Sequence, residues 1–194
     1  MDELFSTRNG YTPSKSNKDF WEGDTIVPWF RMEDIRENGR ILDDATQHVT
    51  KAAVKGNLFP ADSIIISTSA TIGEHALITV PSLANQRFTY LMVRREYQHM
   101  VDMKYLFYYG FKLGDYCREH LNQGNFASVD MGKFNEFVFM LPSLAEQKKI
   151  ASVLERFDKL CNDLSSGLPA EIEARQKQYE YYRDKLLTFQ ERKQ

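Results

Sequence analysis

The sequence lacks the uninterrupted apolar run of about 18 residues that a membrane-spanning helix needs, so we expect no membrane span. Residues 1–13 do not combine a basic start with an apolar core, which argues against a signal peptide. Cysteine is rare, and Cys117 and Cys161 stand too isolated to suggest a disulfide framework. Together these absences predict a cytoplasmic protein.

The motifs of common catalytic and metal sites are also missing. The four histidines are scattered, without the Cys/His spacing of a zinc site. The sequence contains no P-loop, no G-x-G-x-x-G and no H-E-x-x-H motif. The serine-rich stretch 67–73 lacks the G-x-S-x-G frame of a nucleophilic serine, and nothing matches the cofactor loop of a methyltransferase. We therefore expect no catalytic residue, no metal site and no cofactor in this chain.

Charge of one sign does not dominate either. The formal net charge is −2, which argues against a simple basic nucleic-acid binder. Residues 1–44 hold 6 Lys and Arg against 10 Asp and Glu, a net charge of −4. Residues 45–142 (9 against 8) and residues 143–194 (10 against 9) each carry +1. Any surface for nucleic acid must therefore be a local patch on a nearly neutral body.

Residues 1–142 contain short apolar runs separated by polar turns. The β-branched run at 63–67 is typical of a buried strand, and Gly73 stands at the bend that leads to the next run. We predict strands over residues 25–31, 63–67, 75–80, 88–93 and 137–141, and helices over residues 50–56 and 100–121. The expected class is α+β, a globular domain with a mixed or antiparallel sheet and short helices.

Residues 143–194 show helical periodicity. Ser143 precedes Glu146 by three residues, the spacing of a capping box. Two apolar stripes follow, with the steps of three, four and seven that are typical of a coiled-coil seam. The first comprises Ile150, Leu154, Phe157, Cys161 and Leu164, and the second Ile172, Tyr179, Tyr182, Leu186 and Phe189. The stripes are out of register and Pro169 interrupts them, so we predict two helices joined by a kink or tight turn, a coiled-coil-like arm after residue 142.

Three polar loops of the predicted domain carry side chains suited to DNA. The hydroxyls of residues 67–71 either contact phosphates and base edges or satisfy their own turn, and the sequence favours neither. Residues 85–87 (Asn-Gln-Arg) have side chains that can read adenine and guanine. Ordinary loop polarity is the simpler interpretation of that stretch alone. The same holds for residues 123–128, a connection from helix to strand.

Taken in order along the chain, several short motifs resemble those of one family. They lie at residues 10–13, 25–29, 64–67, 70–73, 85–86, 141–150 and 168–189. The chain resembles the specificity subunit of type I restriction–modification enzymes, and more narrowly half of one. The resemblance spans nearly the whole chain, and the P-x-L-x-E-Q-x-x-I stretch at 142–150 is its most specific part. It implies one target recognition domain, residues 1–142, and one conserved helical region, residues 143–194, where the usual subunit carries two of each.

The resemblance also implies sequence-specific recognition of double-stranded DNA without catalysis. In this family the recognition domains read the two parts of a split target, while the helical regions set their spacing and dock the methyltransferase subunits. The implied partners are DNA, methyltransferase subunits and a restriction subunit, and S-adenosylmethionine and ATP would belong to those subunits. The chain stops where a second recognition domain would begin, which leaves open whether it is a natural half-subunit or a fragment.

The predicted DNA face combines the polar loops with the short helix at 50–56. Two lysines of that helix would contact phosphates, while a serine, an arginine and an asparagine of the loops (Ser69, Arg87, Asn125) would read bases. The full predicted set is Lys51, Lys55, Ser67, Thr68, Ser69, Thr71, Arg87, Gln123, Asn125, Ser128 and Lys133. Asn85 and Gln86 match a family pair that we expect to hold loop structure instead.

The helical arm is predicted to pair with a second copy, because two helices with a thin apolar stripe are marginally stable alone. All residues of the two stripes named above form the predicted interface. Such a homodimer would recognise a split palindrome. The competing interpretations are an arm that folds back on its own head and an assembly adaptor whose head does not bind DNA, which the acidic residues 1–44 favour slightly. A stand-alone nuclease is disfavoured, since no metal-binding carboxylate motif occurs.

Overall fold

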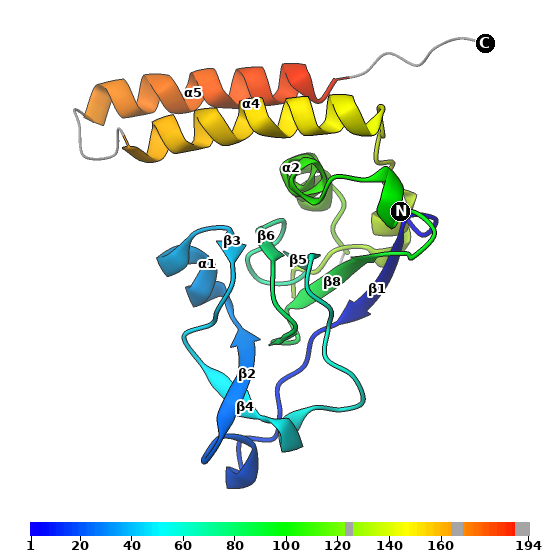
Figure 1. The fold of residues 1–194 in the computed structure, drawn as a ribbon, viewed down its shortest axis with the longest axis vertical. Coiled ribbons are helices and arrows are strands. Elements are labelled where there is room, and N and C mark those ends of the chain that lie inside the picture. The colour runs from blue at the N-terminus through cyan, green and yellow to red at the C-terminus, as the bar shows by residue number, and fades with distance from the viewer. Residues whose placement is uncertain (123–125, 164–168, 189–194) are drawn as a thin grey trace. The chain divides into compact units, whose positions relative to one another are not determined.

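A computed structural model describes residues 1–122, 126–163 and 169–188 (Figure 1). Contacts divide the chain into two units, of which the first holds Met1–His99 and Leu113–Val138. The second holds Met100–Lys112 and the described residues from Phe139 onward. This division cuts the chain at several places rather than once, and the functional boundary at 142/143 stays a prediction.

Five strands form the larger sheet of the first unit. They are β1 Phe5–Asn9, β3 Ile41–Leu42, β5 Ser63–Ser67, β6 His75–Ile78 and β8 Phe88–Val93, in the order β1-β8-β5-β6-β3. Neighbours are antiparallel except β3 and β6, which are parallel. Every residue of β5 and β6 is buried, which explains why the isoleucine run of β5 is apolar on both faces.

The smaller sheet has the order β4-β2-β7. Its strands are β2 Thr25–Phe30, β4 His48–Thr50 and β7 Leu83–Ala84. A hydrophobic core cluster joins the two sheets and includes Trp29 from β2 and Ile65 from β5. Tyr90 of β8 stacks on Phe59 in the same cluster, with ring centroids 3.7 Å apart. The sheets therefore share one packed interior within the first unit.

Short helices complete the first unit. They are α1 Met32–Asn38, α3 Met131–Glu136 and the 3-10 helices η1 Lys18–Phe20 and η2 Lys51–Ala53. The buried Asp34 carboxylate accepts hydrogen bonds from the backbone N–H groups of Arg31 (2.6 Å) and Thr46 (2.7 Å). Asp130 caps α3 by accepting from the Gly132 and Lys133 N–H groups. The N–H groups of Arg31, Gly132 and Lys133 are donors that a helix start leaves open.

Helices make up the second unit. They are the first part of α2 Met103–Glu119, α4 Leu144–Asp163 and α5 Pro169–Leu186, and the 3-10 helix η3 Gln98–Met100 precedes α2. Gln147 ties the start of α4 to the chain around α2. Its fully buried side chain donates to the carbonyls of Met100 and Pro142 and accepts from the Asp102 N–H, each at 2.9 Å. No helix in the described ranges is long and apolar enough to cross a membrane.

Most long predicted elements are present. The α+β class is confirmed, and β2, β5, β6 and β8 match four predicted strands within a few residues. The helix predicted over residues 100–121 is α2. The tail is divided into α4 and α5 as predicted, and their connection lies outside the described residues. The capping serine is also confirmed, because the Glu146 N–H donates to the Ser143 hydroxyl at 3.3 Å.

Two predicted elements need correction. The strand predicted over residues 137–141 is wrong, because that segment has no regular structure. Its aromatic side chains pack on rings of α2 instead. The ring centres of Phe137 and Tyr116 lie 5.2 Å apart, and so do those of Phe139 and Tyr109. The helix predicted over residues 50–56 is only the 3-10 turn η2. The hydroxyl of its N-cap, Thr50, donates to the Asp19 carbonyl rather than capping the helix.

Candidate nucleic-acid interface

The loop between β5 and β6, residues 68–74, is held in one shape by its own bonds. The Ser67 N–H donates to the Glu74 carbonyl (2.7 Å) and the Gly73 N–H to the Ser67 carbonyl (2.9 Å). The Ser67 hydroxyl donates to the Ser69 carbonyl at 2.8 Å. Ala70 adopts a φ of 64°, a left-handed conformation that costs a residue with a Cβ roughly 1–2 kcal/mol. The loop is therefore organised before any ligand binds.

Two glycines allow this loop to lie directly against the backbone of α2. A Cβ added to Gly73 would lie 2.5 Å from the Gly114 carbonyl oxygen, and a Cβ added to Gly114 would lie 2.5 Å from the Gly73 carbonyl oxygen. The Arg118 guanidinium, one turn further along α2, donates to the Ile72 carbonyl at 3.3 Å. The two backbones touch because neither residue has a side chain.

The structure brings the three predicted polar loops together. The Thr68 N–H donates to the Arg87 carbonyl and the Val129 N–H donates to the Thr68 carbonyl, each at 2.9 Å. Ser69 and Ser128 form an isolated antiparallel bridge. We call the surface formed by Thr68, Ser69, Thr71, Arg87 and Ser128 the loop cluster. Its members come from three separate parts of the sequence.

The loop cluster combines half-buried hydroxyls with one exposed cation. Within the part of the chain that the structure describes, the Arg87 guanidinium has no hydrogen-bond or ion-pair partner. The Thr68 hydroxyl bonds with that of Thr89 (3.2 Å), and the Thr89 hydroxyl donates to Asn9 Oδ1 (2.9 Å). These bonds connect the cluster through β8 to Asn9, the last residue of the edge strand β1.

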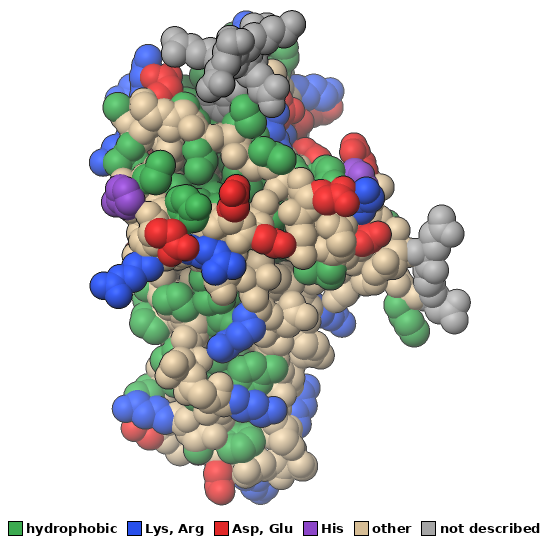
Figure 2. Space-filling view, turned by 90° about the vertical axis from the view of Figure 1, so that its right-hand side faces the viewer, with side chains coloured by type: hydrophobic (Ala, Val, Ile, Leu, Met, Phe, Trp, Pro, Cys, Tyr) green, Lys and Arg blue, Asp and Glu red, His purple; other side chains and the backbone are tan. Residues whose placement is uncertain are grey.

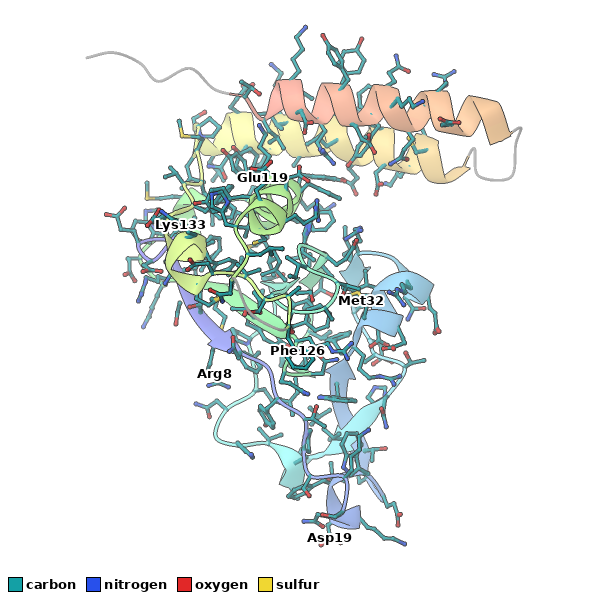
Figure 3. The ribbon with its side chains drawn as sticks, turned by 180° about the vertical axis from the view of Figure 1, so that it is seen from behind. Arg8, Asp19, Met32, Glu119, Phe126 and Lys133 are labelled. Atoms are coloured by element: carbon teal, nitrogen blue, oxygen red, sulfur yellow. The ribbon has the colours of Figure 1, made fainter. Side chains whose placement is uncertain are left out.

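An aromatic side chain that the sequence did not single out projects beside the loop cluster. Phe126, labelled in Figure 3, is 88% exposed and lies two residues before Ser128. An apolar group this exposed suits contact with bases or thymine methyl groups. Two residues of the predicted DNA face, Gln123 and the predicted base reader Asn125, lie outside the described residues.

Other predicted residues occupy different places. Ser67 is fully buried, and its bond to the Ser69 carbonyl makes it a residue that shapes the loop rather than one that reaches outward. Lys133 lies in α3, apart from Phe126 in Figure 3. It forms an ion pair with Glu136 (2.9 Å), and that hydrogen bond raises the pKa of its ammonium group. Among the described residues, no group of His, Cys, Asp and Glu is arranged to hold a metal ion.

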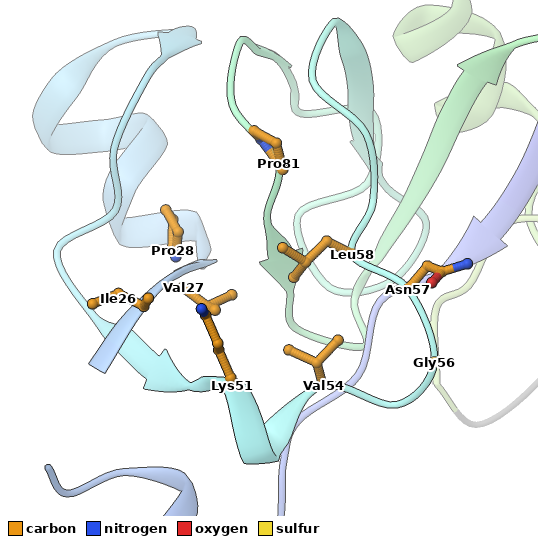
Figure 4. A pocket seen from close by; sticks show the side chains of 9 residues that line it. All are labelled: Ile26, Val27, Pro28, Lys51, Val54, Gly56, Asn57, Leu58 and Pro81. Carbon is orange, nitrogen blue, oxygen red and sulfur yellow. The ribbon is translucent and has the colours of Figure 1, made fainter. Parts of the chain in front are cut away.

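Lys51 and Lys55 lie away from the loop cluster. Lys51 follows Thr50, whose hydroxyl donates to the Asp19 carbonyl, so Lys51 lies near Asp19. Figure 3 shows Asp19 well apart from Phe126. Lys51 also lines an open, mainly apolar pocket of about 420 Å³ with Ile26, Val54 and Leu58 (Figure 4). The Lys55 ammonium lies 5.3 Å from the centre of the Tyr11 ring. These lysines are exposed and suit phosphate contacts, but at a second location on the unit.

The motifs at residues 10–13 and 85–86 contact each other in the structure. Gly10 lies so close to the carbonyl oxygens of Ala84 and Asn85 that a Cβ would overlap both. The Thr12 hydroxyl donates to the Gln86 side chain. Asn85 Oδ1 accepts from the Arg87 N–H at 3.0 Å. The prediction that the Asn-Gln pair holds loop structure is therefore confirmed.

Charge on the surface is mixed rather than segregated. Figure 2 shows basic, acidic and hydrophobic side chains interspersed on one face, in keeping with the net charge of −2. A local basic group does occur beside the loop cluster, where Arg36, Arg40 and Arg118 line one hollow. This group was not predicted, since each arginine is an ordinary polar residue in its own segment.

The predicted interface residues of the tail differ in how far the chain itself buries them. Ile150, Leu154 and Tyr179 are buried within the chain itself. The Phe157 ring stacks on that of Tyr182 at 5.8 Å. Cys161 and Leu186 are half-buried, whereas Leu164, Phe189 and the side chain of Ile172 lie outside what the structure describes.

The second stripe was incomplete in the prediction. The structure buries Leu187, and the Arg183 guanidinium lies 4.9 Å from the centre of the Phe111 ring. Leu160 and Tyr181, which were not predicted, are 55% and 61% exposed. The tail therefore keeps apolar surface at positions the heptad pattern did not mark.

Comparisons with known proteins identify close relatives. The model of the type I restriction modification DNA specificity domain matches residues 1–174. The chain is 53% identical to the specificity subunit of type I restriction enzyme EcoprrI from Escherichia coli, over 98% of this chain and 49% of that protein. It is 36% identical to the EcoR124I/EcoR124II specificity subunit from the same species, over 97% and 47%. The chain thus spans about half the length of the curated relatives it matches.

Solved structures share the fold at low sequence identity. The HsdS subunit from Thermoanaerobacter tengcongensis matches 95% of this chain, with a TM-score of 0.60 and 15% identity. A chain from a structure of the type I R-M system, solved to explain its complex assembly and conformational transition, matches 96%, with a TM-score of 0.64 and 17% identity. This chain covers 43% and 44% of those two chains.

Proposed function

Because the chain belongs to the family of type I restriction–modification specificity subunits, we propose that it recognises a specific sequence in double-stranded DNA. The observation that carries the proposal is the loop cluster, in which backbone bonds join three polar loops at one surface. A surface organised in advance loses little conformational freedom on binding, which favours affinity and specificity. The chain would act without catalysis of its own.

The residues of the proposed DNA face would divide two tasks. Ser69, Arg87 and Ser128 are the candidates for base contacts, with Arg87 suited to guanine. Phe126 would add an apolar contact beside them. Lys51 and Lys55, at the second location, would contact phosphates and orient the domain on the duplex.

The proposal includes partners that supply the chemistry. Methyltransferase and restriction subunits would act at the DNA site that this chain selects, and S-adenosylmethionine and ATP would be bound by those subunits. The relatives at 53% and 36% identity carry the name of specificity subunits of type I restriction enzymes, which supports this assignment. The alternative is an assembly adaptor whose head does not bind DNA by itself.

We also propose that α4 and α5 form a coiled-coil-like arm that pairs with a second copy. The exposed Leu160 and Tyr181 support this, because they leave apolar area on both helices. A two-fold dimer would hold two identical reading domains and recognise a split palindrome. Two copies would also match the full length of the relatives, of which one copy covers about half.

Methylation mapping tests the proposed function. Modified adenines in a host genome should form one split motif when this gene and its methyltransferase genes are present, and the motif should vanish without this gene. An unchanged methylation pattern would contradict the proposal. Binding to a duplex with that motif, measured with and without the methyltransferase subunits, separates DNA reading from pure assembly. An adaptor would add no sequence preference in either case.

A single substitution tests the loop cluster. Arg87→Ala should weaken binding to the target by roughly 1–3 kcal/mol if the side chain reads a base. Arg95→Ala is the matched control, since Arg95 is exposed and lies outside the cluster. Equal losses in both variants would remove Arg87 from the base-reading set.

Sedimentation tests the arm. The wild-type chain should be a dimer at micromolar concentration, and Leu160→Ser with Tyr181→Ser should raise the dissociation constant about tenfold or more, as expected when exposed apolar area is lost from an interface. Lys148→Ser, on the exposed surface of α4, is the control. A wild-type chain that stays monomeric throughout this range would rule out the dimer.

A further inference from the structure

A basic hollow of about 800 Å³ opens beside the loop cluster. Three arginines from separate segments line it: Arg36 in the last turn of α1, Arg40 before β3, and Arg118 at the end of α2. The hollow shares its wall with the polar loops, since Thr71 and Ala127 also line it. Whatever contacts the loop cluster therefore lies next to three guanidinium groups.

Two of these arginines are held in place by the protein. Arg40 pairs with the Glu74 carboxylate and donates to the His75 carbonyl at 3.0 Å. Arg118 pairs with Asp115 and donates to the Ile72 carbonyl. A guanidinium has five N–H donors, so Arg118 retains donors beyond the two that these bonds use. These bonds orient the Arg118 guanidinium and leave some of its N–H donors available.

Arg36 differs from the other two. Its side chain is exposed, and among the residues that the structure describes it has no hydrogen-bond or ion-pair partner. Counting Glu74 and Asp115 against the three arginines leaves an excess positive charge in the hollow. An excess cation in a concave, partly enclosed place favours an anionic ligand more than the same charge on a flat surface would.

We propose that this hollow receives a phosphodiester group of the DNA backbone, with Arg36 as the main contact and Arg118 as a second donor. The inference rests on the proposed function. A duplex whose base edges meet the loop cluster places backbone phosphates on either side of it, and one side is the hollow. Guanidinium groups bind phosphate oxygens through paired N–H donors, and such contacts carry no base preference.

The salt dependence of DNA binding tests this assignment. The slope of log K against log[salt] is negative, and each lost phosphate contact reduces its magnitude by about 0.9. Arg36→Gln, in complex with the methyltransferase subunits, should make the slope shallower by about that amount and weaken binding to target and non-target duplexes equally. Arg36→Lys should keep the slope, because it keeps the charge. Arg95→Gln, the matched control elsewhere on the first unit, should also keep it.

The outcomes separate the two claims. A wild-type complex that shows no sequence preference refutes the proposed function itself. A complex that binds its target normally while Arg36→Gln leaves the slope unchanged refutes only the hollow. Titration of the chain with inorganic phosphate distinguishes a free anion from the DNA backbone. Tight, Arg36-dependent phosphate binding with an unchanged DNA slope would overturn the proposal in favour of a small anion.

Discussion

The two units secure their polar backbone in different ways. In the first unit, glycines let one segment touch another directly, as Gly73 does with Gly114 and Gly10 with Ala84. In the second unit, one buried amide side chain, Gln147, bonds three backbone groups. An added methyl group should therefore damage these glycine contacts of the first unit, and loss of the amide should damage this network of the second.

Gly73→Ala should break the first arrangement and strongly destabilise the fold. The new Cβ would meet the Gly114 carbonyl, and the positive φ of 86° adds conformational strain, so we expect a loss of about 3 kcal/mol. Gly56→Ala is the control, because its φ is also positive (77°) but no atom lies within 4 Å. It should lose only about 1 kcal/mol. Equal losses in urea unfolding would contradict the close contact.

Gln147→Ala should break the second arrangement. It leaves the Met100 and Pro142 carbonyls and the Asp102 N–H without their partner, at a cost of about 1 kcal/mol each, or about 3 kcal/mol together. Urea unfolding measures the loss. Glu146→Ala, its exposed neighbour, should change stability by less than about 1 kcal/mol. A mild effect at Gln147 would mean that water replaces the amide.

At alkaline pH, the buried Tyr90 and Cys117 side chains should make the free energy of unfolding depend on pH. Burial raises the pKa of the Tyr90 hydroxyl above its ordinary value of 10.0, and the pKa of the Cys117 thiol from 9.0 to about 12. The unfolded chain therefore loses these protons first as pH rises. Stability should be unaffected by Cys117 below pH 9 and by Tyr90 below pH 10, then fall by up to about 1.4 kcal/mol per pH unit for each group.

Tyr90→Phe isolates one of these contributions. It should cost about 1 kcal/mol at pH 7, because the Ser82 hydroxyl loses its partner at 3.0 Å. Above pH 10 its stability should fall less steeply than that of the wild type, and urea unfolding at pH 7, 10 and 11 compares the slopes. Parallel curves would show that Tyr90 is not the titrating group.

Ala70→Gly should produce the smallest effect, with the opposite sign. The φ of 64° at Ala70 favours glycine, so the variant should be more stable by about 0.5 kcal/mol after the entropy of glycine is counted. Ala52→Gly in η2, where φ is not positive, should be less stable than the wild type. Thermal unfolding distinguishes the two signs, and destabilisation in both variants would count against strain at Ala70.

The sequence predicts those elements whose side chains alone explain them. The isoleucine run of β5 is buried throughout and was predicted as such. By contrast, β1 has one buried residue, Phe5, and owes its strand form to backbone pairing with β8. α1 lacks a conventional N-cap, because Asp34 at its third position supplies the carboxylate. Backbone pairing and a cap supplied from within the helix leave little trace in an apolar pattern.

The site was predictable in part for the same reason. The polar loops were visible as strings of hydroxyl and amide residues, but their adjacency depends on bonds between Thr68, Arg87 and Val129, which sequence spacing does not encode. The burial of Ser67 and the convergence of Arg36 with Arg118 are likewise properties of the folded chain.

The hydrogen bonds between the loops of the loop cluster have a consequence for engineering. The bonds that link its loops run between backbone groups, from Thr68 to Arg87 and from Val129 to Thr68. Side chains at positions 69, 87 and 128 can therefore be exchanged without removing a single one of those links. A library randomised at these three positions should yield many folded variants, and new target sequences can be selected from it on an unchanged frame.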